Sequence, residues 1–510
     1  MSSIIPIPRT LNPYPRTGVD VGERGPRYVE LTSSLVALLR SRVEQTPDVE
    51  AVVEIGGERF TYLELWERAA RVSGGLRDLG ITKGDRVAIR YPAGITWVTA
   101  FWGTLMAGAI AVATNTRSSE SEVAFMLEDA GVKLDLAADS DLPSGAAHVD
   151  DHLTGDDVAA FFYTSGTTGH PKAVPTTHTA FLTNAVNVST TIGIPANAGA
   201  GMRTLISVPL FHVTGCNTQL LAAVYVGGTS VILPAFNQSQ LLQTLQEERI
   251  TFMVSVPAIY SLILRNKEFD GIDVSRVRWV GYGGAPVAPS LVAQIQKGFP
   301  DARVFNGYGM TESASLMTVL PHEDAVEHAD SIGYAVPSID LGVIPLNDDE
   351  PMVGELVARG ANVTAGYWNR PEANAETFAG GWLHTGDIVR VDDAGRVHII
   401  DRSKDIIIRG GENISSLEVE AALLGAPGVT EAAAIAVPDD VMGEKVGVVL
   451  YSDSGEIVVD DVIAHCRVQL ADYKVPQYVQ VLHQPLPRNA GGKLLKAKLR
   501  HSAQWDALAR

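Results

Sequence analysis

The sequence contains few cysteines and no long run of basic residues. Cys216 and Cys466 are the only cysteines among 510 residues, and they are far apart and lack the spacing of metal ligands. This usage favours a reducing compartment, so we expect a cytoplasmic protein. The chain has 40 Lys and Arg residues against 59 Asp and Glu residues, a formal net charge of −19. That balance argues against a nucleic-acid partner.

A secretion signal is not apparent either, because residues 1–6 lack a basic segment followed by an apolar one. One charge-free stretch, Ile95–Thr114, has about the length that spans a bilayer. Glycines and threonines interrupt it, and its end, Ala109–Val112, is typical of a strand. We therefore predict a buried helix followed by a buried strand. A lipid-like substrate would also allow peripheral contact with a membrane.

The length of the chain favours two or more domains, and 46% apolar residues are enough to form their cores. Residues 1–30 are rich in Pro, Gly and Arg, which predicts an extended arm. Short apolar strands then alternate with helical patterns, which favours an α/β fold with layered sheets and parallel strands. We predict a large domain over residues 31–400 and a small α/β domain over residues 401–510, with the hinge at Asp401.

Several elements can be placed from local signals. Thr61–Glu64 has the pattern of a capping box and predicts a helix to about Leu79, followed by a strand at Val87–Ile89. The other predicted strands are Thr204–Val208, Ser230–Leu233, Phe252–Ser255, Val277–Val280, Val304–Phe305 and Val397–Ile400, and helices are predicted at Gln238–Glu247 and Pro289–Gly298.

The most informative stretch is residues 163–172, which read Tyr-Thr-Ser-Gly-Thr-Thr-Gly-His-Pro-Lys. They follow the apolar residues 159–162, so we expect a strand that leads into a flexible loop. Such a loop offers backbone N–H groups, hydroxyl donors and one cation, and its glycines let the backbone approach a ligand closely. The spacing is not that of a Walker A loop. These features predict a site for an oligophosphate.

Further motifs follow in order along the chain: Pro209–His212, Gly283–Pro286, Asn306–Glu312, Gly354–Leu356, Gly366–Trp368, Leu383–Asp387, Asp401–Asp405, Gly410–Ile414 and Pro487–Lys493. With the loop at 163–172, this series resembles the adenylate-forming superfamily of acyl-CoA synthetases, peptide-synthetase adenylation domains and luciferases. The resemblance covers about residues 35–500. It is strongest to the fatty-acyl and aryl-acid CoA ligases.

The resemblance implies a reaction in two steps. ATP, with Mg²⁺, and a carboxylic acid first give an acyl-adenylate and pyrophosphate, and the thiol of coenzyme A then displaces AMP to give a thioester. The first step needs electrostatic support at the α-phosphate and the close placement of two anions that repel each other.

The resemblance also assigns roles to individual residues. Lys493 would bridge the carboxylate and the α-phosphate, and Thr311 would hydrogen-bond that phosphate. Glu312, with Thr168, would hold Mg²⁺, since a carboxylate combined with phosphate oxygens is the usual magnesium arrangement. The residues assigned to ATP and AMP are Thr164, Ser165, Gly166, Thr167, Thr168, Gly169 and Lys172 for the phosphates, Gly284, Ala285, Asn306, Gly307, Tyr308 and Gly309 at or beside the base, and Asp387 and Arg402 for the ribose.

The small domain would rotate about Asp401 between the steps and exchange Lys493 for the glycine loop at 410–411. The residues assigned to coenzyme A are Lys404, Gly410 and Gly411. Those assigned to the acyl pocket are His212, which would close over it, Val213, Cys216, Gly283 and Ser313. No charged residue is obvious in this set, so we expect an apolar acyl or aryl group.

The chain departs from the common family pattern at two places near these motifs. Ala173 follows Lys172 where glycine is usual, and Ser415–Ser416 replaces a frequent aromatic–proline pair on the acceptor side. The sequence therefore leaves three functions open: an acid–CoA ligase for a fatty, aryl or other apolar acid, an enzyme that loads a carrier-protein phosphopantetheine, and a catalytically silent binding protein. The intact Lys172, Glu312, Asp387 and Lys493 argue against the last. A monomer and a homodimer are both compatible with the sequence.

Overall fold

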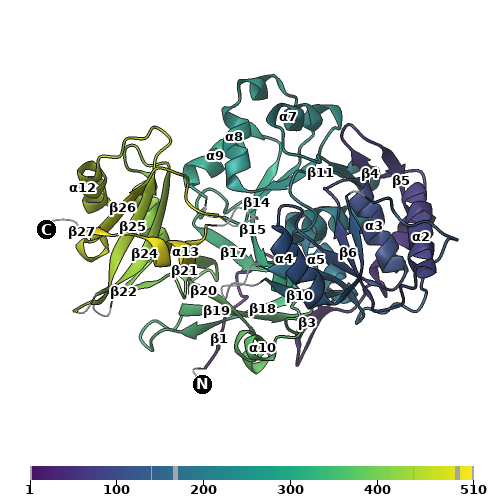
Figure 1. The fold of residues 1–510 in the computed structure, drawn as a ribbon, viewed down its shortest axis with the longest axis horizontal. Helices are drawn as coiled ribbons and strands as arrows, with labels where there is room; N and C mark the ends of the chain where they lie inside the picture. Colours follow the sequence, from purple (N-terminus) through teal and green to yellow (C-terminus); the bar gives the residue numbers. More distant parts are fainter. Residues whose placement is uncertain are drawn as a thin grey trace.

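Two α/β units of unequal size make up the chain, with the small C-terminal unit beside the large one (Figure 1). The computed structural model describes residues 3–138, 140–164, 171–285, 287–409, 412–439, 441–488 and 494–507. The α/β class predicted from the alternation of strands and helices is confirmed.

The main sheet of the large domain has a parallel centre and antiparallel ends. Its strands, in spatial order, are β1 (Ile5–Pro6), β18 (Ile339–Pro345), β19 (Val353–Gly360), β20 (Leu383–Val391), β21 (Val397–Arg402), β17 (Ser331–Ala335), β16 (Ser315–Leu320), β15 (Arg303–Met310), β14 (Trp279–Gly283), β13 (Phe252–Ser255), β11 (Arg203–Ile206), β12 (Thr229–Ile232), β4 (Glu50–Glu54) and β5 (Arg59–Thr61). The strands from β15 to β4 run parallel, so their carboxyl ends share one edge, which is where open α/β sheets bind ligands.

A second sheet has the order β10 (Lys172–Thr177), β9 (Val158–Thr164), β7 (Ile110–Ala113), β6 (Arg86–Arg90) and β8 (Val132–Ala137). The helices of the large domain are α1 (Leu35–Gln45), α2 (Tyr62–Asp78), α3 (Ile95–Met106), α4 (Glu120–Ala130), α5 (His178–Ile192), α6 (Leu221–Val226), α7 (Gln238–Glu247), α8 (Pro257–Arg265), α9 (Pro289–Gly298) and α10 (Pro371–Thr377), with a π-helix at Thr214–Leu220 and 3₁₀ turns at Gly199–Gly201, Lys267–Gly271, Thr311–Ser313 and Ala379–Gly381.

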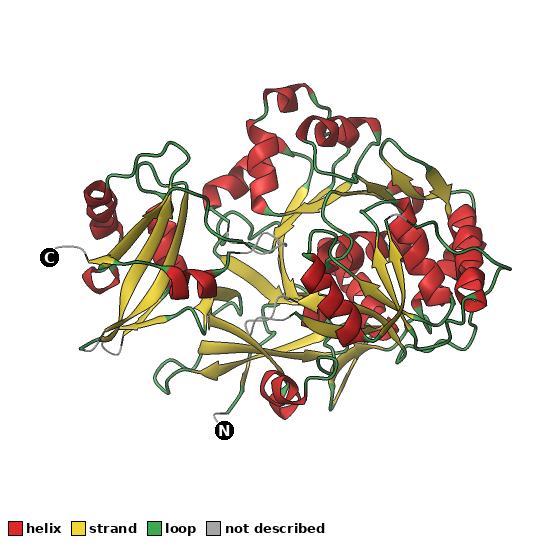
Figure 2. Ribbon diagram, in the orientation of Figure 1, coloured by secondary structure: helices red, strands yellow, loops and turns green. Residues whose placement is uncertain are grey.

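Helices lie against the sheets (Figure 2), and apolar side chains of both are buried. Helices α7, α8 and α9 pack on the parallel strands through Leu241, Ile263 and Val292, each 0% exposed. Helix α5 contributes Phe181 to one core and Val188 to another, so it joins two parts of the large domain.

Elements with strong local signals lie where the sequence predicts them. Thr61 Oγ accepts the Glu64 N–H at 3.2 Å, and the Glu64 carboxylate accepts the Thr61 N–H at 2.8 Å, so the predicted capping box begins α2. The charge-free stretch forms α3 and β7, a buried helix and a buried strand. Across the described residues, no helix combines the length and apolarity needed to cross a membrane.

Residues 3–30 form an arm that contains three short strands. β1 pairs with β18, which is more than 300 residues away in the chain. A hairpin of β2 (Val19–Gly22) and β3 (Gly25–Tyr28) follows. The arm is thus tied to the main sheet by backbone hydrogen bonds.

The small domain forms one mixed sheet with helices. Its strands are β22 (Ile407–Arg409), β23 (Glu412–Ile414), β24 (Glu431–Asp439), β25 (Gly443–Tyr451), β26 (Tyr478–Leu482) and β27 (Asp506–Ala507), and its helices are α11 (Ser416–Leu424), α12 (Val459–Gln469), α13 (Lys496–Ser502) and a 3₁₀ turn at Asp472–Lys474. Its core includes Val419, Val448 and Val462, all fully buried.

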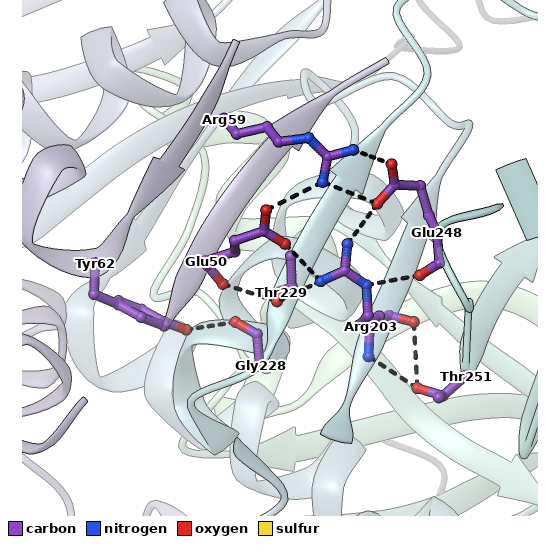
Figure 3. A network of polar contacts seen from close by, with 8 residues as sticks. All are labelled: Glu50, Arg59, Tyr62, Arg203, Gly228, Thr229, Glu248 and Thr251. Atoms are coloured by element: carbon purple, nitrogen blue, oxygen red, sulfur yellow. Dashed lines mark hydrogen bonds and ion pairs between the residues drawn. The ribbon is translucent and has the colours of Figure 1, made fainter. Parts of the chain in front are cut away.

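An ion-pair network joins the amino-terminal edge of the parallel strands (Figure 3). Arg203 lies 2.8 Å from Glu50 and 2.6 Å from Glu248, and Arg59 also pairs with both glutamates. Side chains from β4, β5, β11 and the end of α7 therefore neutralise one another. The network lies at the edge opposite the carboxyl ends, so we assign it to stability.

A buried histidine at the start of α5 makes stability depend on pH. Burial and the charge of Lys83 lower the pKa of His178 from 6.5 to about 4, although Asp157 acts in the opposite direction. Its Nδ1 accepts the Leu35 N–H at 3.2 Å. Because the unfolded chain binds this proton first, stability is lost as the pH falls from 6.5 towards 4, by about 2 kcal/mol at pH 5.

We predict that His178→Asn, which keeps an acceptor near the Nδ1 position, reduces this loss. The fall in melting temperature between pH 7.5 and pH 5 should be smaller than in the wild type by roughly 2–4 °C. The exposed His152 provides the control, and His152→Asn should leave the fall unchanged. Equal behaviour of the two variants in thermal melts would contradict the prediction.

Candidate active site

A buried carboxylate lies between two donors at the junction of three strands. Asp387 in β20 is the Cα partner of Arg402 in β21, and Arg402 Nε lies 2.5 Å from Asp387 Oδ1. The Tyr308 hydroxyl, from β15, donates to Asp387 Oδ2. Burial and the Asp387 charge hold the pKa of Tyr308 well above its usual range, so this phenol stays protonated. Asp387, 2% exposed, is thus fixed as an acceptor beside an aromatic ring.

A second cluster consists of Glu312, Tyr367 and Lys172. Glu312, in the 3₁₀ turn after β15, accepts the Tyr367 hydroxyl at 2.7 Å. The ammonium of Lys172 lies 4.3 Å from the centroid of the Tyr367 ring, within reach of a cation–π interaction. Lys172 begins β10 and pairs with Thr164 at the end of β9, so the stems of the predicted phosphate loop lie near Glu312. The predicted phosphate ligands Ser165, Gly166, Thr167, Thr168 and Gly169 lie outside the described residues.

Glu312 fits a role as a protein ligand of Mg²⁺, and Thr168, the other predicted ligand, lies outside the described residues. Its residue is 5% exposed, and Tyr367 is the only side chain among the described residues with a recorded hydrogen bond to its carboxylate. The described part of the chain has no cluster of three or more His, Cys, Asp or Glu residues suited to a metal ion. Mg²⁺ commonly takes one or two carboxylates and completes its shell with substrate phosphates and water. One buried carboxylate that shares the contact of Tyr367 with Lys172 is compatible with that requirement.

The carboxyl ends of β14 and β15 meet beside Tyr308. Gly283 pairs with Gly307, and a Cβ at Gly283 would lie 2.2 Å from the Gly307 carbonyl oxygen, so only glycine fits this approach. Asn306 is 9% exposed, and its Nδ2 donates to the Ser331 carbonyl at 3.2 Å. The predicted base-side residues therefore come together at one edge. The remaining members of this set, Gly284, Ala285 and Gly309, are exposed there.

The predicted acyl-pocket residues fall into two groups. His212 and Val213 are half-buried, and burial, with the charge of Arg117, lowers the pKa of His212 to about 4. His212 is therefore neutral near pH 7. Cys216 and Ser313 are 0% exposed, with Cys216 packed in a core. Their assignment to the pocket stays a prediction.

The predicted hinge is held by the small domain. Asp401 is 1% exposed and accepts the Ser416 hydroxyl at 3.0 Å, and the Ser416 N–H also donates to its carboxylate. Lys496 donates to the Ser416 hydroxyl at 2.7 Å. A proline at 416 would lack both donors, so this departure from the family pattern has a structural consequence. Lys404 is exposed, and Gly410, Gly411 and Lys493 lie outside the described residues.

Two residues of this site received no role from the sequence. Tyr367 lay within a recognised motif but without an assigned function, and it contacts both Glu312 and Lys172. Thr364 donates its N–H to the Glu312 carbonyl at 2.8 Å and its hydroxyl to the Pro175 carbonyl at 2.6 Å. It thereby ties the Glu312 turn to β10, a contact for which no sequence signal exists.

The two carboxylate clusters, the strands that flank the predicted phosphate loop and the two-domain α/β fold are those expected of an adenylate-forming enzyme. Residues 39–368 match the AMP-binding enzyme family, and residues 418–493 match the AMP-binding enzyme C-terminal domain. The chain therefore belongs to the AMP-binding enzyme family.

Similar proteins extend over nearly the whole chain. The long-chain-fatty-acid–CoA ligase FadD13 of Mycobacterium tuberculosis is 35% identical over 91% of this chain and 97% of its own length. The feruloyl-CoA synthase of Amycolatopsis sp. is 36% identical over 90% and 97%. The structure of o-succinylbenzoate CoA synthetase (MenE) from Bacillus subtilis with an acyl-adenylate aligns with a TM-score of 0.83 and 30% identity, over 92% of this chain and 99% of that one.

We predict that Asp387→Asn weakens AMP binding. The substitution removes the charge opposite Arg402 and one acceptor, and charge-assisted hydrogen bonds are worth enough to lower affinity roughly tenfold or more. Isothermal titration with AMP measures the change. Asp392, whose carboxylate lies 2.8 Å from Arg396 in the adjacent turn, offers a matched Asp–Arg pair. If Asp392→Asn lost the same affinity, damage to the sheet would explain both results.

Proposed function

We propose that this chain is an ATP-dependent acid–CoA ligase. A carboxylate oxygen of the acid attacks the α-phosphate of ATP and pyrophosphate leaves, which gives an acyl-adenylate. The thiol of coenzyme A then attacks the acyl carbon, AMP leaves and a thioester forms. The observation that carries this proposal is that β15 and the turn after it connect two clusters. Tyr308 in β15 donates to Asp387, and Glu312 in the turn accepts from Tyr367, whose ring lies beside Lys172.

Each of these residues suits one part of the nucleotide. Asp387 has two carboxylate oxygens that can accept the two ribose hydroxyls, and Tyr308 offers a ring for the base. Lys172 stands at the stem of the phosphate loop and would neutralise the outer phosphates. Glu312 would hold Mg²⁺, which supplies positive charge where the transferred phosphate becomes more negative. Thr311, next to Glu312, would donate to the same phosphate.

We propose a fatty or other apolar acid as the substrate. Val213, Cys216 and Gly283 carry no charge, and His212 is neutral near pH 7 because its pKa is lowered. None of these side chains would compensate a charge on the acyl group. The names of the similar proteins give a long-chain fatty acid, a feruloyl group and an o-succinylbenzoyl group as substrates. They therefore support ligation of an acid to coenzyme A, but they do not favour one particular acid.

A panel of acids tests both parts of the proposal. Pyrophosphate release is measured for fatty, aryl and dicarboxylic acids, with and without coenzyme A, together with formation of the thioester. We expect release with apolar acids and thioester with free coenzyme A. Thioester formation only with an added carrier protein would favour the carrier-loading alternative, and absence of release with every acid would contradict adenylation.

We predict that Lys493→Ala separates the two half-reactions. The lysine would stabilise charge only during adenylate formation, so that step should slow by roughly 10²-fold or more. Thioester formation from supplied acyl-AMP should be largely retained. Equal losses in the two assays would contradict a rotating small domain that carries Lys493 into the first step.

The cytoplasmic location, the peripheral membrane contact and the choice between a monomer and a homodimer stay predictions.

A further inference from the structure

Residues 313–316, which follow Thr311 and Glu312, form a turn with an unusual backbone. Ala314 has φ +53° and Ser315 has φ +114°, and both directly follow the Thr311–Ser313 turn. Residues other than glycine seldom occupy this region, and those that do gather at functional sites where the surroundings impose the conformation. A Cβ at Gly309 would lie 1.5 Å from the Ser315 carbonyl oxygen, so β15 also packs tightly against the turn.

Three buried asparagines hold this turn by its backbone. Asn217 Nδ2 donates to the Ala314 carbonyl at 2.9 Å. Asn362 Nδ2 donates to the Ser313 and Leu316 carbonyls at 2.8 and 3.0 Å, and Asn184 Oδ1 accepts the Leu316 N–H at 3.0 Å. All three asparagines are 0% exposed.

The asparagines come from separate elements. Asn184 lies in α5, Asn217 in the π-helix and Asn362 in the loop after β19. Asn184 Nδ2 also donates to the Asn217 carbonyl at 3.2 Å, so two of them support each other. A purely local turn would not need partners from three distant parts of the chain.

Asn217 also leaves a buried polar atom without a partner. Its Oδ1 has no hydrogen bond among the described residues, and such a group is unfavourable in a core. Its Nδ2 donates to the strained turn, two residues after Glu312. Asn217 also follows Cys216 in the π-helix that begins two residues after His212. It therefore connects a segment that carries predicted acyl-pocket residues to the turn.

We propose that Asn217 and Asn362 are positioning residues for adenylation, an inference that rests on the proposed function. They hold residues 313–316 in the strained conformation and thereby fix Thr311 and Glu312 relative to the phosphates. Catalytic groups must be held to within fractions of an ångström, and misplacement by about 1 Å can reduce rates about 10²-fold. Neither asparagine needs to touch the substrate.

The same π-helix supplies a matched control. Gln219 is also 0% exposed and also has an oxygen without a partner among the described residues. Its Nε2 donates to Thr204 and to the Leu205 carbonyl at 3.0 and 2.7 Å, in β11 and away from the turn. Asn217→Leu and Gln219→Leu therefore each remove a buried side-chain amide of the same π-helix that donates hydrogen bonds to another element.

We expect both variants to lower the melting temperature, but only Asn217→Leu to slow pyrophosphate release, by about 10²-fold in kcat. It should also raise the Mg²⁺ concentration for half-maximal rate and weaken Mg²⁺-dependent binding of a non-hydrolysable ATP analogue in calorimetry. AMP binding at Asp387 and thioester formation from supplied acyl-AMP should be retained. Asn362→Leu should behave like Asn217→Leu.

A rescue experiment distinguishes a loss of positioning from general damage to the fold. It also keeps the test decisive if Asn217→Leu folds poorly. Ala314→Gly makes the left-handed conformation accessible without a constraint, because glycine adopts it freely. Added to Asn217→Leu, it should restore adenylation about fivefold or more, and added to Gln219→Leu it should restore nothing.

Equal kinetic defects in Asn217→Leu and Gln219→Leu, or no rescue by Ala314→Gly, would overturn the positioning role. Failure of the wild type to release pyrophosphate with any acid would instead overturn the proposed function, so the two failures are distinguishable.

Discussion

The contact between Asp387 and Arg402 connects the parts on which the site depends. It joins β20 to β21, and the hydroxyl of Tyr308 brings β15 to the same carboxylate. β15 leads directly into the turn that carries Glu312, while β21 contains the predicted hinge residue Asp401 next to its last residue, Arg402. One buried carboxylate therefore links the strand that precedes Glu312 to the strand that contains Asp401. A buried charge is tolerated there because two donors satisfy it.

Electrostatics explains why the candidate site contains many hydrogen bonds and close contacts between charged and polar groups. A chain with a net charge of −19 gains no long-range attraction for ATP or for a carboxylate. Binding must then rely on short-range donors and on a few local cations, such as Lys172 near Tyr367. These interactions depend steeply on distance, so the groups that present them must be rigid. The ties from Thr364 to Glu312 and to β10 supply that rigidity.

Elements with local signals could be predicted from sequence, and contacts between distant segments could not. The capping box at Thr61 and the bounds of α7 and α9 depend on neighbouring residues, so their patterns were sufficient. The pairing of β1 with β18 depends on a distant edge strand, and the arm was predicted only as extended. The contacts of Tyr367 and of the buried asparagines could not be predicted for the same reason. A buried asparagine and an exposed one look alike in a sequence.

By itself, the sequence determined the class of chemistry. It did so through a series of motifs that together resemble one family, because such motifs depend on residue type and order along the chain. Tertiary structure alone decided which donors contact Asp387, why the pKa of His212 is lowered and how the turn at 314–315 is held. Those properties arise from burial and from hydrogen bonds between segments far apart in the chain, and both exist only after the chain has folded.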